Sequence, residues 1–72
     1  MFELFHRIVD AGSAQARKRV TALGLELKFR NVEFEKPAAR LKELGGDGTV
    51  PALWDGETLH VGTEAVLARL SR

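Results

Sequence analysis

The sequence predicts an α/β domain in which a mixed sheet of four strands is covered by helices on both faces. Short apolar segments with partial alternation are separated by segments whose apolar residues recur every three or four positions, which is the pattern of strands alternating with helices. Asp55-Gly56, between two short apolar segments, is a strong hairpin signal. The 72 residues allow one domain, residues 1–72. The expected order is strand, helix, strand, helix, hairpin and helix.

The first strand and helix are predicted from residues 2–24. Phe2–His6 is rich in aromatic residues and partly alternating, which indicates a strand. The following helix should begin with Asp10 or Ser13 as its cap and end at Gly24. Its expected buried stripe is Ala16, Val20 and Leu23.

Residues 25–30 are predicted to form a half-buried edge strand. Apolar residues alternate with charged ones there, and the expected buried set is Leu25, Leu27 and Phe29. Charged alternate positions suit a sheet edge that must not pair with other molecules. The alternation slips at Asn31, so the strand should end or bulge at that residue. A strand reached through a helix should be parallel to the first one, with a right-handed connection.

The C-terminal half should supply a second helix, the hairpin and a last helix. Pro37 suits the first turn of the second helix, whose expected stripe is Ala38, Leu41 and Leu44. Ala52–Trp54 and Thr58–Val61 are the expected hairpin strands around Asp55-Gly56. Thr63 is predicted to cap the last helix, whose buried stripe should be Val66, Leu67 and Leu70.

Composition excludes several classes of function. The absence of cysteine rules out disulfides, thiolate metal sites and any mechanism that needs a protein thiol. A formal net charge of +1 argues against a dedicated nucleic-acid binder. No apolar segment approaches the ~18 residues of a membrane span, and no leader opens the chain, so we expect a soluble, cytoplasmic protein. His6 and His60 follow no metal-ligand spacing.

Charge is unevenly distributed along the chain. Residues 1–30 hold six basic side chains against three acidic ones, whereas residues 31–57 hold three basic and six acidic ones. Two solvated faces of opposite sign explain this pattern. The alternative is a positively charged opening near the first helix that takes an anionic small molecule.

The order of elements resembles the thioredoxin fold, and more narrowly the glutaredoxins and the N-terminal domain of glutathione transferases. Thr49-Val50-Pro51 is similar to the Thr-Val-Pro of glutaredoxins. Gly62-Thr63-Glu64 resembles the element that opens their last helix. The resemblance covers nearly the whole chain. It implies that the Val50–Pro51 peptide is cis and that the backbone of Val50 pairs with an extended ligand, which in these relatives is glutathione.

The resemblance also implies which residues hold that ligand. The expected site for glutathione, or for a similar small thiol peptide, comprises Arg7, Thr49, Val50, Pro51, Thr63 and Glu64. Arg7 would meet the glycyl carboxylate. The helix start at Thr63 would hold the γ-glutamyl carboxylate, and Glu64 its amine. These residues also have structural interpretations, Arg7 as a solvated loop arginine, and Thr63 with Glu64 as a helix cap and first-turn acid.

Two positions depart from the redox families. Asp10 and Ser13 stand where the resemblance places the nucleophilic and resolving cysteines, and a carboxylate forms no mixed disulfide. Asp10 is then best interpreted as a helix cap, because a general base would need a paired acid or a raised pKa. The expected function is non-redox binding of glutathione or a related peptide, without a cofactor. The alternatives are a transferase-like enzyme that activates bound glutathione through Ser13 or backbone donors, and a purely structural interaction domain.

Overall fold

The computed structural model describes residues 1–72, and it confirms the expected order of elements. The strands are β1 (Glu3–His6), β2 (Lys28–Asn31), β3 (Ala52–Trp54) and β4 (Leu59–Val61). The helices are α1 (Ala11–Leu23), α2 (Glu35–Glu43) and α3 (Thr63–Leu70). The four strands form one mixed sheet in the order β2-β1-β3-β4, in which β1 and β2 are parallel and the other pairs antiparallel. The predicted α/β class, parallel first unit and hairpin are therefore correct.

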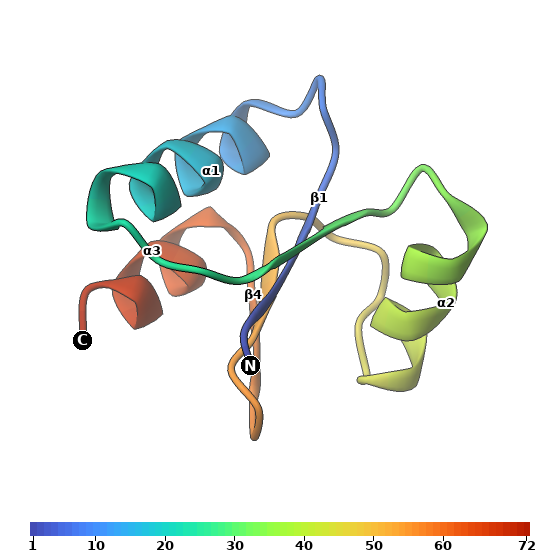
Figure 1. Ribbon diagram of the computed structural model, residues 1–72. Coiled ribbons are helices and arrows are strands. Elements are labelled where there is room, and N and C mark those ends of the chain that lie inside the picture. The colour runs from blue at the N-terminus through green and yellow to red at the C-terminus, as the bar shows by residue number, and fades with distance from the viewer.

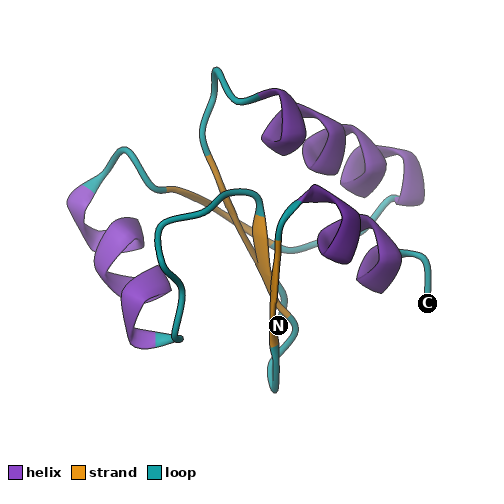
Figure 2. Cartoon of the chain, turned by 180° about the vertical axis from the view of Figure 1, so that it is seen from behind, coloured by secondary structure: helices purple, strands orange, loops and turns teal.

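Helices cover both faces of the sheet. Figure 1 shows α1 and α3 side by side on one face and α2 on the other, and the view from behind in Figure 2 agrees. Adjacent residues of β1 supply the two cores, because side chains alternate along a strand. On the α1–α3 face the buried cluster is Leu4, Ala16, Val20, Leu53, Val66 and Leu70. On the α2 face it is Phe5, Val32, Leu41 and Ala52.

The sheet topology gathers four connecting segments at one end of the sheet. His6 pairs with Asn31, Phe5 with Ala52, and Ala52 with Val61. Consequently β1, β2 and β4 all finish at the end where β3 begins. The residues predicted to hold a ligand follow or precede the strands at this end, which we call the site end.

The edge strand β2 differs from its prediction. It begins at Lys28 rather than at Leu25, although it ends at Asn31 as expected. Leu25 and Phe29 are 40% and 49% exposed, so the predicted buried face is wrong except at the half-buried Leu27. The reason is tertiary: Phe29 pairs with the fully buried Leu4, but α1 and α3 pack over the central strands and leave the edge uncovered.

The helices confirm most of their predicted stripes and correct the rest. Leu23 is 48% exposed, because α1 ends there beyond the cover of the sheet. Ala38 is also exposed. Helix α2 begins at Glu35, so Pro37 lies in its first turn, as predicted. The predicted cap at Thr63 is wrong: Gly62 is the N-cap, and Thr63 lies inside the first turn without a side-chain cap bond.

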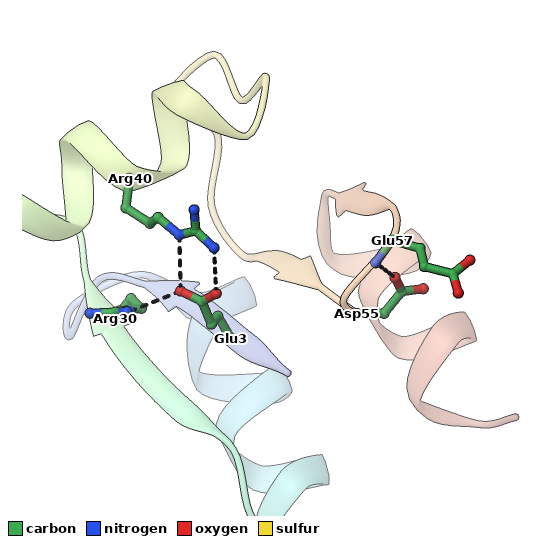
Figure 3. A network of polar contacts seen from close by, with 5 residues as sticks. All are labelled: Glu3, Arg30, Arg40, Asp55 and Glu57. Carbon is green, nitrogen blue, oxygen red and sulfur yellow. Dashed lines mark hydrogen bonds and ion pairs between the residues drawn. The ribbon is translucent and has the colours of Figure 1, made fainter. Parts of the chain in front are cut away.

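The hairpin loop is longer than the predicted two-residue turn. Four residues, 55–58, connect the strands, and β4 begins at Leu59 rather than at Thr58. The Asp55 carboxylate causes this difference. Its Oδ1 accepts the backbone N–H of Glu57 at 2.8 Å (Figure 3) and also that of Thr58 at 2.7 Å. The backbone amides of Glu57 and Thr58 therefore donate to Asp55 within the loop rather than to the partner strand.

A buried carboxylate connects three elements away from the site end. Glu3 on β1 is 6% exposed. Arg30 from β2 donates to its Oε1 at 3.0 Å, and Arg40 from α2 donates to its Oε2 at 3.0 Å (Figure 3). The hydrogen bond from Arg40 is the main reason that the pKa of Glu3 is lowered, against the opposing effect of burial. The ionised carboxylate thus ties β2 and α2 to the central strand.

Candidate functional site

Asp10 caps α1, as the sequence predicted. Its Oδ2 accepts the backbone N–H of Ser13 at 2.7 Å, and its backbone is extended, as is usual at a cap. This hydrogen bond lowers the pKa of Asp10, and the positive charges of Arg17 and Arg7 contribute further. Asp10 is thus a stable anion at the helix start, which is the opposite of the raised pKa that a general base would need.

Ser13 is fully buried and forms part of the same turn. Its Oγ accepts the backbone N–H of Arg7 at 3.1 Å, while its own N–H is held by Asp10. The hydroxyl therefore closes the connection from β1 to α1. It is engaged in the fold and is not presented to a ligand.

Gly12 brings two of the predicted ligand residues, Pro51 and Thr63, against the Asp10 cap, and sequence reasoning did not single it out. A methyl group on its Cα would lie 3.1 Å from Pro51 Cδ and 3.4 Å from Asp10 Oδ2, and it would overlap Thr63 Oγ1. The start of α1 therefore lies directly against the start of β3 and the start of α3. Both helices point their positive ends toward this junction.

Val50 offers free backbone groups beside that junction. The Val50–Pro51 peptide is cis, as the resemblance implied. Val50 lies outside every helix and strand, and its N–H and C=O are absent from the hydrogen bonds of the turns and loops. Pro51 C=O, in contrast, accepts the N–H of Gly62 at 2.9 Å. The Val50 side chain packs on the α2-side core, which fixes its backbone in place.

The remaining predicted residues are placed less favourably. Thr49 is exposed, and its N–H donates to Asp47 Oδ1 at 3.0 Å within a local turn. Glu64 is exposed in the first turn of α3. Arg7 is exposed on the connection from β1 to α1, where its guanidinium has no ion-pair partner within the chain. Thr63 is half-buried against Gly12, and its hydroxyl has no hydrogen-bond partner.

Arg17 stabilises the connection from β1 to α1 at the site, a role that sequence analysis missed. Its guanidinium donates to Arg7 O at 3.0 Å and to Ile8 O at 3.1 Å. It also donates to Nδ1 of the buried His6 at 2.9 Å. The only sequence signal was its spacing from Ser13, i to i+4, which places the two side chains near each other on one side of α1.

Neither of the two hollows in the surface is lined by the predicted site residues. One lies between α1 and α3, and the other lies beside the C-terminal end of α2. The site end is therefore an open surface of backbone groups and helix starts. No group of three or more His, Asp or Glu side chains converges in the structure.

Comparison with known proteins assigns no family to the chain. No model of a protein family matches it, and no curated protein matches it. None of the three helices has the length and apolarity that crossing a bilayer requires.

Proposed function

We propose that this chain has a thioredoxin-type fold of the glutaredoxin or transferase N-terminal kind. We further propose that it is a binding module for glutathione or a related small peptide, without redox chemistry of its own. The unpaired backbone of Val50 carries the proposal. An extended peptide could add to that N–H and C=O as one more strand, with its main chain supplying the hydrogen bonds.

The two helix starts beside Val50 supply the other half of the proposed site. Helix N-termini hold unpaired N–H groups and favour carboxylates. The backbone N–H groups of Thr63 and Glu64, in the first turn of α3, donate to no acceptor within the chain. A peptide that pairs with Val50 would place a terminal carboxylate against them, and the Arg7 guanidinium could meet a second one. Glutathione has two carboxylates on a short extended backbone, which fits this arrangement.

The anionic Asp10 makes the proposed binding independent of a free thiol. A carboxylate in this position repels a thiolate, so recognition must rest on the peptide backbone and carboxylates of the ligand. The buried and engaged Ser13 hydroxyl gives no support to activation of a bound thiol. Binding without turnover is therefore the function that this geometry supports best.

The test is a titration of the ¹⁵N-labelled protein with reduced glutathione and, in parallel, with S-methylglutathione. Both ligands should shift the amide signals of Gly12, Val50 and Thr63 at millimolar concentration, with similar affinity. The Arg7→Ala variant should bind both ligands more weakly, whereas Lys36→Ala, which removes a cation from the exposed surface of α2, should not change binding. Absence of any shift at Val50 with either ligand would refute the proposal.

A further inference from the structure

A groove of about 360 Å³ lies between α1 and α3, away from the site end. It is lined by Gln15, Lys18, Arg19, Ala22 and Leu67. The four residues of α1 stand at i, i+3, i+4 and i+7, so they form one continuous stripe about 10 Å long. Figures 1 and 2 show α1 and α3 side by side, with no third element on their outer side.

The charge of this groove is uncompensated. Its lining has two cations and no acidic residue. None of the ion pairs of the chain involves Lys18 or Arg19. Arg19 is instead held by a hydrogen bond from Nη1 to Ser71 Oγ at 3.2 Å, which connects α1 to the end of α3. The guanidinium is thereby fixed beside the groove while most of its donors stay free.

Apolar surface accompanies these charges. Ala22 and Leu67 contribute the apolar part of the groove lining. Leu23, whose side chain was expected in the core, is 48% exposed one turn beyond Arg19. The outer surface of α1 therefore combines apolar contacts with flanking cations, which is the complement of a helix with an apolar stripe edged by acids.

We infer that the α1–α3 groove is a docking surface for an acidic amphipathic helix of a partner protein. Such a helix would lie along the groove, bury its apolar stripe on Ala22, Leu23 and Leu67, and place carboxylates beside Lys18 and Arg19. The stems of the two cations would cover its apolar edge while their charged ends stay in water. This surface is separate from the peptide site proposed above.

A small anion fits the groove less well. The α1 residues that line it lie in the middle of the helix, where the backbone N–H groups are used in the helix itself. A free phosphate would find only the exposed ends of Lys18, Arg19 and Gln15, and such solvated pairs contribute little. A helix gains the apolar contact as well. Nucleic acid would require more than two converging cations.

The experiment uses the full chain and a fluorescein-labelled synthetic helix with Leu at heptad a and d positions and Glu at the flanking ones. We expect saturable binding by anisotropy, with shifts of the amides of Lys18, Ala22 and Leu67 and none at Val50. The double variant Lys18→Glu/Arg19→Glu should weaken binding by about tenfold or more, because attraction becomes repulsion. The single variant Ala22→Glu, which keeps good helix propensity, should weaken it as well.

Matched controls decide whether the groove itself is responsible. Lys36→Glu reverses an exposed charge on α2, so an equal loss of binding in this variant would show unspecific charge attraction and overturn the inference. A peptide of the same composition without heptad spacing should bind at least about fivefold more weakly, and equal binding would overturn the helical occupant. If the same amides respond more strongly to inorganic phosphate or to phosphatidylserine vesicles, the groove binds an anion or a membrane surface, and the inference of a helical partner is overturned. Self-association at the groove, measured by sedimentation, would show that a second copy of this chain occupies it and would overturn the inference of a partner helix.

Discussion

Gly12 is the residue at which the three segments of the proposed peptide site meet. Any side chain there must displace Thr63 Oγ1 and press on Pro51. We expect Gly12→Ala to lower the free energy of unfolding by about 1–3 kcal/mol, the usual cost of overpacking, even though alanine is the better helix former. Urea denaturation of both proteins measures this change.

The matched control removes Thr63 Oγ1, the atom that the added methyl group of Gly12→Ala would overlap. Thr63→Ala alone should change stability by less than about 0.5 kcal/mol, because the hydroxyl caps nothing. In the double variant Gly12→Ala/Thr63→Ala, most of the loss should be recovered. A double variant as unstable as Gly12→Ala would show that Thr63 is not the source of the clash.

His6 makes the stability of the site pH-dependent. Arg17 can only donate, so Nδ1 of His6 must accept, and the ring is neutral. Burial lowers the pKa of His6 below its usual 6.5, and the charge of Arg17 lowers it further, while Glu33 acts in the opposite direction. Because the unfolded chain binds the proton more readily, the stability held above pH 6.5 is lost as the pH falls below that value.

Substitution of His6 isolates this effect. His6→Asn retains an acceptor near the Nδ1 position but cannot titrate. The wild-type protein should lose stability between mildly alkaline and mildly acidic pH, and His6→Asn should lose less over the same range. Denaturant midpoints at the two pH values measure the difference. An identical loss in both proteins would assign the pH dependence to the carboxylates.

At the scale of elements, Asp55 determines the form of the β3–β4 hairpin and its attachment to α3. Besides the two loop amides, it accepts His60 Nε2 at 2.9 Å and Arg69 Nε at 3.0 Å through Oδ2. The bond from His60 contributes most to holding the pKa of Asp55 far below its usual range. Arg69 in turn lies over the Phe2 ring, 4.9 Å from its centroid, so the network connects β4, α3 and the N-terminal segment.

Two substitutions separate the loop function of Asp55 from its charge. Asp55→Asn keeps an acceptor for the Glu57 and Thr58 amides but loses the charge, whereas Asp55→Ala loses both. Hydrogen exchange of these two amides should become fast in Asp55→Ala and stay slow in Asp55→Asn. In both variants, the backbone amides of the last turn of α3 should exchange faster than in the wild-type protein. Unchanged protection in Asp55→Ala would show that the loop is stabilised by other contacts.

At the scale of the whole molecule, the convergence of two helix starts predicts that thiol chemistry can be introduced. Wild type has no sulfur nucleophile and should not reduce disulfides. A cysteine at the α1 cap faces free N–H groups and the helix dipole, an environment that lowers thiol pKa values to about 3.5–7.5. We expect Asp10→Cys to form a mixed disulfide with oxidised glutathione and to gain measurable reductase activity.

The control for this prediction is Ser13→Cys, at a position that is fully buried. Its thiol should react more slowly with an alkylating reagent and with oxidised glutathione. Thiol pKa from pH-dependent alkylation and adduct mass are the measurements. Should Asp10→Cys titrate at the ordinary thiol value and react no faster than Ser13→Cys, the placement of a ligand site at the α1 start would be wrong.

The sequence alone determined the order of elements, because each depends on local chemistry. The Asp10 cap, the Gly24 end of α1 and the slip at Asn31 are signals within a few residues of the boundaries they set. The buried stripes of the helices were predictable where the helix lies over the sheet, as at Ala16 and Val20. Such signals act through backbone hydrogen bonds and side-chain periodicity, which do not require the rest of the chain.

Only the tertiary structure decided what those elements bring together. The close approach of Gly12 to Thr63 and the hydrogen bond from Arg17 to His6 join residues from different elements, and no spacing rule specifies such contacts. Exposure of Leu23 and Phe29 depends equally on which neighbouring elements extend far enough to cover them. An apolar side chain indicates that burial is favourable, but the packing of the whole chain decides whether another element covers it. The same packing produces both the junction at Gly12 and the open α1–α3 groove.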